Sequence, residues 1–373
     1  MIADQLTPLD ATLLELEEAD ESAPIDSGKL RVLVVGGGVA GLEATLALSE
    51  LAGERVETTM LAPNSEFVYR PLAVREPFSY SPARRYPLAA VVRDASAELH
   101  AGELAWVDRA VRTAHTKAGS EILYDALLLA LGARAVPRYK HALTIDDRRM
   151  DETLRGLIQD IEEGYVKRVA FVSPGRMAWP LPLYELALMT AARAHDASIA
   201  LSVTLITPEE VPLAVFGGDA SEAVRSLLDD AGIEFVASAY AEIPAAREII
   251  VHPSGRTLPA DRVIALPELY GPSVRGIPLG QHGFLPTDPS MRVPDAGPVF
   301  AAGDATEFPV KHGGVGSQQA DVAAEAIAAL AGAEVEPKRF RPTIEGVLLT
   351  GGTPLHLSAH LTGGRGARAE VST

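Results

Sequence analysis

The chain contains no cysteine at any of its 373 positions. Without thiols it has no disulfide, no thiolate metal ligand, no iron–sulfur ligation and no dithiol redox chemistry. It also lacks an apolar run of the ~20 residues that a membrane span needs, and its N-terminus shows no basic region followed by an apolar stretch. We therefore expect no metal site, no integral membrane span and a cytoplasmic location.

Positive charge is also scarce, with 33 Lys and Arg against 50 Asp and Glu and a net charge of −17 at pH 7. This balance argues against nucleic acid or an anionic membrane surface as a partner. Eight acids and no Lys or Arg lie in residues 1–28, which predicts a solvated acidic N-terminal arm. The remaining length and a hydrophobic content of 47% are enough for a large core, and they suggest two domains.

Apolar strand patterns and helical patterns alternate along the chain after the arm. The first block predicts a buried parallel strand, a helix and a second strand at residues 29–35, 39–51 and 55–61. The second block repeats this order at residues 166–172, 184–195 and 199–206. We expect residues 64–87, which are rich in proline, to be largely irregular. The repeated pattern predicts an α/β fold of two Rossmann-like, doubly wound domains.

A glycine loop joins the first predicted strand to its helix. Gly36, Gly38 and Gly41 fit the spacing G-x-G-x-x-G, with Val39 and Ala40 opening the helix. The first glycine permits a tight turn, the second lets the backbone approach a pyrophosphate, and the third packs the helix on the strand. The helix N-terminus then faces the phosphates. The loop therefore predicts dinucleotide binding.

The acid that usually follows the second strand of such a site is missing here. That position falls on residues 61–63, and Ala62 accepts no hydrogen bond from ribose hydroxyls. Either Asn64 or Glu66 supplies this contact, or the adenosine end of the ligand is held less tightly.

Two further motifs follow in a recognisable order. Residues 299–305, which include Gly303 and Asp304, resemble the strand-Gly-Asp element that holds the ribityl chain of FAD in flavoproteins with two dinucleotide domains. Residues 124–133 are similar to the D-x-L-x-x-A-x-G-A crossover of the same proteins, and residues 64–72 to the loop beside the flavin in type II NADH dehydrogenases and sulfide:quinone oxidoreductases. The resemblance covers about residues 30–330.

This resemblance implies FAD as cofactor, with its pyrophosphate on the glycine loop and Asp304 on the ribityl chain. Arg70 and Pro71 would line the cofactor. Further cofactor contacts are expected at Gly132, Ala133, Gly303 and Gly313. The FAD domain would comprise residues 29–137 and 278–338, interrupted by a second domain at 138–277 and followed by a C-terminal segment at 339–373.

Lys311 and His312 stand just ahead of a helix predicted at residues 316–330. A reduced flavin carries negative charge near N1 and O2, and a cation together with a helix dipole stabilises that charge. We therefore take these two residues as candidate catalytic groups that face the flavin. The alternative is that they are ordinary loop residues.

The second block lacks an intact glycine loop. Of residues 173–182 only Gly175 is glycine, three prolines remove backbone donors, and Trp179 fills space that a pyrophosphate needs. We therefore do not expect NADH or NADPH to bind there. Sulfide:quinone oxidoreductases also have a degenerate second loop, but they use reactive cysteines, so the sulfide reaction is not expected either.

The pocket on that side has three candidate aromatic walls, Tyr69, Trp179 and Tyr184, whose alternative is ordinary core packing. After Arg341 the chain shows no amphipathic membrane anchor of the kind found in the two families that it resembles. Either the acceptor is soluble, or a membrane segment comes from a partner or has been lost.

The sequence therefore predicts an FAD-dependent oxidoreductase between an unidentified small donor and a quinone-like or protein acceptor. A homodimer or a protein redox partner is compatible with it. The alternatives are an NAD(P)H-dependent flavin reductase and a non-catalytic nucleotide-binding protein.

Overall fold

The computed structural model describes residues 28–78, 82–175, 179–361 and 367–372. The chain forms two units, and the first contains a five-stranded sheet in which all neighbouring strands run parallel. Successive residues of the central strand face two separate cores, Val32 and Val34 one of them and Leu33 and Val35 the other. This burial on both faces explains its continuous apolar run. The strands in spatial order are β20 (Val299–Ala301), β9 (Ala126–Leu129), β1 (Leu30–Val35), β2 (Val56–Ala62) and β5 (Glu98–Ala101).

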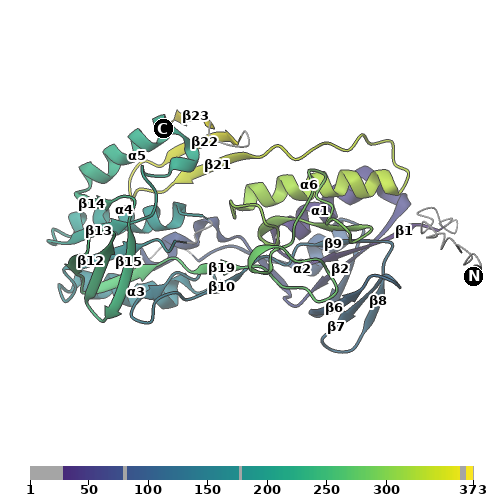
Figure 1. Cartoon of the computed structure of the whole chain (residues 1–373), viewed down its shortest axis with the longest axis horizontal. Helices are drawn as coiled ribbons and strands as arrows, with labels where there is room; N and C mark the ends of the chain where they lie inside the picture. The colour runs from purple at the N-terminus through teal and green to yellow at the C-terminus, as the bar shows by residue number, and fades with distance from the viewer. Residues whose placement is uncertain (1–27, 79–81, 176–178, 362–366, 373) are drawn as a thin grey trace, which may run out of the picture.

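Helices cover one face of this sheet and a small antiparallel sheet covers the other. The helices α1 (Val39–Ala52) and α6 (Gly313–Leu330) lie side by side (Figure 1), with α2 (Leu88–Asp94) next to α1. Their alanine-rich buried faces allow this close packing. The small sheet on the opposite face consists of β6 (Leu104–Asp108), β7 (Thr113–Thr116) and β8 (Glu121–Leu123).

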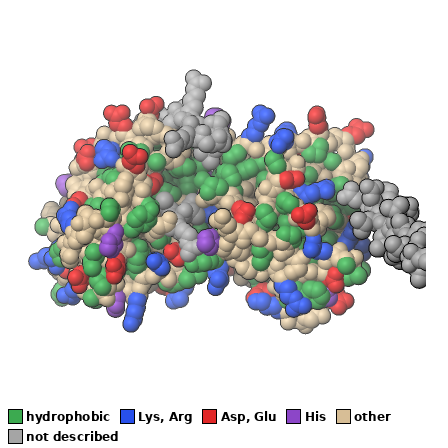
Figure 2. Space-filling view, in the orientation of Figure 1, with side chains coloured by type: hydrophobic (Ala, Val, Ile, Leu, Met, Phe, Trp, Pro, Cys, Tyr) green, Lys and Arg blue, Asp and Glu red, His purple; other side chains and the backbone are tan. Residues whose placement is uncertain are grey.

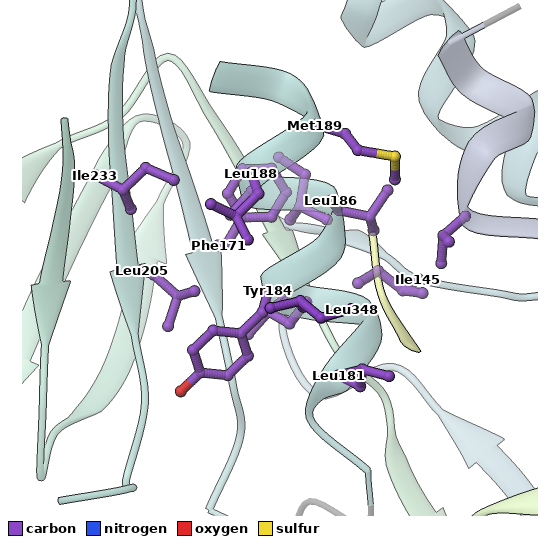
Figure 3. Packing of buried hydrophobic residues seen from close by; sticks show 14 of the residues in the cluster. Ile145, Phe171, Leu181, Tyr184, Leu186, Leu188, Met189, Leu205, Ile233 and Leu348 are labelled. Atoms are coloured by element: carbon purple, nitrogen blue, oxygen red, sulfur yellow. The ribbon is translucent and has the colours of Figure 1, made fainter. Parts of the chain in front are cut away.

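The second unit contains another five-stranded sheet of parallel strands. The strands in spatial order are β11 (Leu143–Thr144), β18 (Arg262–Ala265), β12 (Arg168–Val172), β13 (Ser202–Ile206) and β14 (Ile233–Val236). The helices are α3 (Met150–Glu162), α4 (Leu181–Asp196) and α5 (Gly218–Asp230), and an antiparallel sheet contains β15 (Tyr240–Ala245), β16 (Glu248–His252) and β17 (Arg256–Pro259). Figure 3 shows α4 packed against the strands, with Tyr184 and Leu188 toward Phe171 and Leu205.

The second sheet lies within the sequence of the first, because the chain leaves after β9 and returns to form β20. Two short antiparallel strands mark the two crossings, β10 (Arg134–Val136) and β19 (Glu268–Tyr270). The predicted fold, two Rossmann-like units with one inserted in the other, is confirmed. The exact domain boundaries given above stay a prediction.

The segment at residues 64–87 is more regular than predicted. It contains β3 (Glu66–Val68), which pairs with β4 (Arg85–Pro87), and the 3₁₀ helix η2 (Arg70–Phe78). The expectation of a largely irregular segment is wrong because η2 buries Ala73, Val74 and Phe78 in the core of the second unit. Tertiary packing overrides the local effect of the prolines.

Two helices begin earlier than predicted. Their predicted starts are residues 184 and 316, and each helix begins three residues before that. The helix α6 begins at Gly313, and α4 begins at Leu181 because Pro182 fits in a first helical turn.

The C-terminal segment forms a three-stranded antiparallel sheet that the sequence analysis missed. After α6 the chain runs back across the molecule to β21, as Figure 1 shows. The strands are β21 (Thr343–Leu348), β22 (Leu355–Leu361) and β23 (Ala367–Ser372). Ile344, Leu348 and Leu357 from this sheet are fully buried in the core of the second unit, and Leu348 lies beside α4 in Figure 3.

Candidate functional site

The first glycine loop lies where β1 meets α1, and its backbone permits no larger residue at two positions. Gly36 has φ of +121°, and a Cβ there would lie 2.1 Å from the carbonyl oxygen of Ala130. A Cβ at Gly41 would lie 1.9 Å from the carbonyl oxygen of Gly36. Around Gly38, in contrast, nothing lies within 4 Å of the corresponding position. The loop is therefore tightly packed on the protein side and open at its middle glycine.

The first turns of α1 and α6 meet next to this loop. A Cβ at Gly303 would lie 3.0 Å from the Cβ of Ala40, and one at Gly313 would lie 3.9 Å from the Cγ2 of Val39. Neither helix has a side-chain cap at its N-terminus. Two sets of helix N-terminal amides therefore point toward one edge of the sheet, which suits an anionic ligand. The structure thus brings seven predicted residues together: Gly36, Gly38, Val39, Ala40, Gly41, Gly303 and Gly313.

Asp304 follows the end of β20 in a tight turn that starts at Gly303, whose φ is +73°. Its side chain is half-buried, and burial raises the pKa of the carboxyl while the nearby charge of Lys311 lowers it. Among the described residues, the Asp304 carboxylate has no hydrogen-bond partner. It is therefore a free acceptor for a ligand hydroxyl at the same sheet edge.

The crossover after β9 adds a cavity of about 260 Å³ to this edge. Gly132 and Ala133 line the cavity together with Leu104 of β6 and with residues 271–274. Ala130, two residues before Gly132, contacts Gly36. The crossover predicted from the sequence therefore continues the surface that begins at the glycine loop.

The strand end beside the loop is apolar. Ala62 is buried, and a Cβ at Gly37 would lie 3.2 Å from the Cβ of Ala62 and 2.6 Å from Leu88. Of the two residues proposed to replace the missing acid, Glu66 already pairs with Arg85 at 3.4 Å, and Asn64 is exposed. The end of β2 therefore carries no carboxylate, and a ribose contact from Asn64 or Glu66 stays a prediction.

Arg70 and Pro71 open η2 between the two units. The Nη1 of Arg70 lies 3.0 Å from a carboxylate oxygen of Asp147, which precedes α3. Both charges act on the pKa of Asp304, which Asp147 raises and Arg70 lowers. Pro71 is exposed. Arg70 therefore belongs to one electrostatic cluster with Asp304, although its direct partner is Asp147.

Lys311 points into its own loop. It is buried, its Nζ donates a hydrogen bond to the carbonyl oxygen of Thr306, and it lies 4.1 Å from the centre of the Phe284 ring. Burial lowers the pKa of Lys311 to about 8, against the opposing effect of Asp304. The expectation that Lys311 faces a flavin stays a prediction, and its observed partners are those of a residue that holds the loop.

His312 stands at the N-cap of α6, and its ring centre lies 4.6 Å from that of Trp179. Its Nδ1 is buried without a hydrogen-bond partner, and burial lowers the pKa of the imidazole. Trp179 also packs edge-on against Phe216, at 5.6 Å between ring centres. The neutral His312 and Trp179 therefore form an aromatic contact between the two units.

The second strand-to-helix turn is closed where the first is open. A Cβ at Gly175 would lie 2.8 Å from the ring of Tyr240. The acid at the end of β13, Glu209, accepts hydrogen bonds from the hydroxyl of Tyr184 at 2.6 Å and from that of Thr207 at 3.2 Å. Residues 176–178 of this turn lie outside the described residues. The carboxylate placed to bind a ribose is thus already engaged by the protein.

The three candidate aromatic walls have different surroundings. Tyr184 is fully buried in the core, so it does not line a pocket. Trp179 is partly buried against His312, and Tyr69 is 44% exposed. Sequence reasoning missed Glu209, although its place directly after the apolar run of β13 was a usable signal.

A model of the pyridine nucleotide-disulphide oxidoreductase family matches residues 30–328. The chain belongs to this family. Membership indicates FAD as the cofactor and an FAD-dependent oxidoreductase as the class of enzyme. The open glycine loop and the unpartnered Asp304 carboxylate fit this cofactor. No significant match was found among curated protein sequences.

Solved structures of family relatives have the same fold. Sulfide:quinone oxidoreductase from Aquifex aeolicus has a TM-score of 0.83 and 19% identity, covering 92% of this chain and 87% of that one. A ferredoxin reductase from Rhodopseudomonas palustris has a TM-score of 0.68 and 20% identity, covering 88% and 82%. The NAD-dependent persulfide reductase from A. fulgidus has a TM-score of 0.62 and 19% identity, covering 89% and 63%. At these identities the likeness shows the fold.

None of the helices in the described ranges is both long and apolar enough to cross a membrane. No cluster of three or more His, Asp or Glu side chains in those ranges is placed to hold a metal ion. On the face drawn in Figure 2, acidic and basic side chains are interspersed.

Proposed function

We propose that this FAD-dependent oxidoreductase passes electrons between a small-molecule donor and a quinone-like or protein acceptor without using NAD(P)H. One observation carries the proposal, the contrast between an open first nucleotide turn and a closed second one. Gly38 has free space around it, whereas Gly175 is covered by the ring of Tyr240.

Two further features of the second turn oppose a pyridine nucleotide. Pro180 and Pro182 remove amide donors at the start of α4, where a pyrophosphate would bind. Glu209 is held by Tyr184 and is unavailable to a ribose. Displacing this buried hydrogen bond would leave a carboxylate without its partner, which costs about 1–3 kcal/mol or more.

The residues of the first unit have distinct tasks around bound FAD, which supplies reversible two-electron chemistry. The glycine loop and the N-terminus of α1 would bind the pyrophosphate, the N-terminus of α6 would face the flavin ring, and the Asp304 carboxylate would accept a hydrogen bond from a ribityl hydroxyl. The neutral His312 and Trp179 exclude water on the side of the second unit.

The proposed acceptor follows from the structural relatives and from the composition. Structural relatives include a quinone oxidoreductase and ferredoxin reductases, one of them in a covalent complex with putidaredoxin. The absence of cysteine removes any route through protein thiols. We therefore retain a quinone-like molecule or a redox protein as acceptor, and a homodimer and a cytoplasmic location stay predictions.

An anaerobic titration tests the proposal. The purified protein should show flavin absorbance that micromolar NADH or NADPH does not bleach within minutes, and after chemical reduction of the flavin a quinone should restore that absorbance. Rapid bleaching by NADH or NADPH would instead establish an NAD(P)H-dependent reductase. A protein that neither contains nor takes up FAD would overturn the assignment as a flavoenzyme.

A further inference from the structure

Gln319 is a polar side chain on the buried face of α6. It is 1% exposed, and most of its neighbours on that face are alanine or other small or apolar residues. A buried amide is costly unless its oxygen and nitrogen both find partners. The position therefore calls for an explanation in terms of what the amide binds.

Both ends of the Gln319 amide bind the turn that carries Asp304. The Oε1 accepts a hydrogen bond from the backbone N–H of Gly303 at 2.8 Å, and the Nε2 donates to the Oγ1 of Thr306 at 3.3 Å. The Thr306 hydroxyl in turn donates to the carbonyl oxygen of Gly303 at 3.0 Å. These three bonds link Gln319 to the two ends of the turn, Gly303 and Thr306, and Asp304 lies between these two residues.

The helix is close enough for this contact only because small residues separate it from the turn. A Cβ at Gly316 would lie 3.2 Å from the Cα of Gly303. Gly316 and Gln319 are three residues apart on α6 and so lie on the same helix face. From the other side, Lys311 holds the carbonyl oxygen of Thr306. The backbone of the turn is thus held at both of its ends by the side chains of Gln319 and Lys311.

We infer that Gln319 is a positioning residue for the cofactor, which holds the Gly303–Thr306 turn so that the free Asp304 carboxylate meets the ribityl chain of FAD. This inference rests on the proposed function. It assigns no direct contact between Gln319 and FAD. The effect of Gln319 on binding passes through the backbone of Gly303, and the side chain at work is that of Asp304.

The neighbouring residue is a matched control. Gln318 also binds a backbone segment with both ends of its amide, but in β21: it donates to the carbonyl oxygen of Thr343 at 2.8 Å and accepts from the Thr343 N–H at 2.9 Å. Its Nε2 also donates to the carbonyl oxygen of Gly314 in its own helix at 3.0 Å. Gln318→Leu therefore removes a similar set of bonds from the same helix turn. It leaves the Gly303 turn intact.

The experiment measures FAD binding to the full chain after removal of the flavin. Wild type, Gln319→Leu, Gln318→Leu and Thr306→Val are titrated with FAD by flavin fluorescence, and hydrogen exchange of residues 299–308 is followed without FAD. We expect Gln319→Leu to raise the Kd for FAD about tenfold or more and to speed exchange at the turn. Gln318→Leu should change neither, and Thr306→Val should raise the Kd less than Gln319→Leu.

Each outcome decides between the possibilities. An unchanged Kd in Gln319→Leu, with wild type binding FAD, would overturn the inference and leave the proposed function intact. Equal weakening by Gln318→Leu would also overturn it, because the effect would then be general loosening of α6. If Gln319→Leu does not fold, Thr306→Val decides, since it removes the two bonds of the Thr306 hydroxyl and keeps the bond from the Gly303 N–H to Gln319. An unchanged Kd in Thr306→Val would then overturn the inference. Failure of wild type to bind FAD would overturn the proposed function, and the inference with it.

Discussion

The two strand-to-helix turns of this protein start from the same architecture and have opposite surfaces. The first, between β1 and α1, is free of contacts at Gly38 and ends on uncapped helix amides. The second, between β12 and α4, has Tyr240 against Gly175 and prolines at the helix start. The difference shows that a Rossmann-like unit retains its packing after its ligand surface is replaced by protein. Four predictions test this comparison.

The largest difference is expected when alanine replaces a glycine of each turn. Gly41→Ala places a Cβ 1.9 Å from the backbone oxygen of Gly36, so the loop must move and FAD binding should be lost. In Gly175→Ala the Cβ meets the exposed side chain of Tyr240 at 2.8 Å, and the ring is free to turn away. Gly175→Ala should therefore keep its FAD. The FAD content after purification and the melting temperature are measured for both variants. Retention of FAD by Gly41→Ala would contradict the geometry of the loop.

The second prediction concerns Glu185, a buried residue of α4, the helix that follows the closed turn. It is 4% exposed, accepts a hydrogen bond from the Leu349 N–H at 3.2 Å, and burial raises the pKa of its carboxyl to about 8. The folded protein holds this proton while the unfolded chain loses it above its ordinary pKa of 4.5. This group therefore makes stability fall as pH rises from 4.5 to 8.

Glu185→Gln should remove that fall. The gain in unfolding free energy over wild type should grow from pH 4.5 to about 8, to a total on the order of 5 kcal/mol, and then stay constant. Urea unfolding at a series of pH values measures it. A pH-independent difference between variant and wild type would contradict the raised pKa.

The third prediction tests the hydrogen bond between Tyr184 and Glu209, near the end of β13. Tyr184→Phe removes the hydroxyl that donates a hydrogen bond to Glu209 at 2.6 Å. The buried carboxylate then keeps the longer bond from Thr207 at 3.2 Å. Unfolding free energy should drop by about 2 kcal/mol, with FAD affinity unchanged. Thermal or urea unfolding beside an FAD titration checks this. If FAD affinity fell as much as stability, the second turn would be coupled to the cofactor after all.

The smallest expected effect is at Asp304, in the open site. Asp304→Asn keeps the shape of the side chain but weakens its acceptor, and the Kd for FAD should rise about tenfold, or about 1.4 kcal/mol. Stability without FAD should not fall, since the carboxylate has no hydrogen bond to lose within the described residues. A drop in the melting temperature of the FAD-free protein would indicate a structural task instead.

Local sequence patterns predict the parts of the candidate site that depend on backbone shape. Spacing predicts the first glycine loop, and resemblance predicts Gly303-Asp304 and the crossover at Gly132, because close backbone packing leaves few residue types possible at such positions. They meet at one sheet edge, as the confirmed fold requires.

Features that depend on distant partners were not found. The three-stranded C-terminal sheet and the docking of η2 depend on the core of the second unit, which no local pattern reveals. The same holds for the bonds of Gln319 to Gly303 and of Tyr184 to Glu209, each of which joins elements 16 or 25 residues apart.

The position of β21 and β22 has a consequence for how the protein is made. The first sheet needs β20, and the core of the second unit needs Ile344, Leu348 and Leu357, all of which leave the ribosome late. Neither unit is complete during most of translation, so apolar surface on α4 stays uncovered until the last strands arrive. We therefore expect neither unit to fold cooperatively before β21 and β22 have been synthesised.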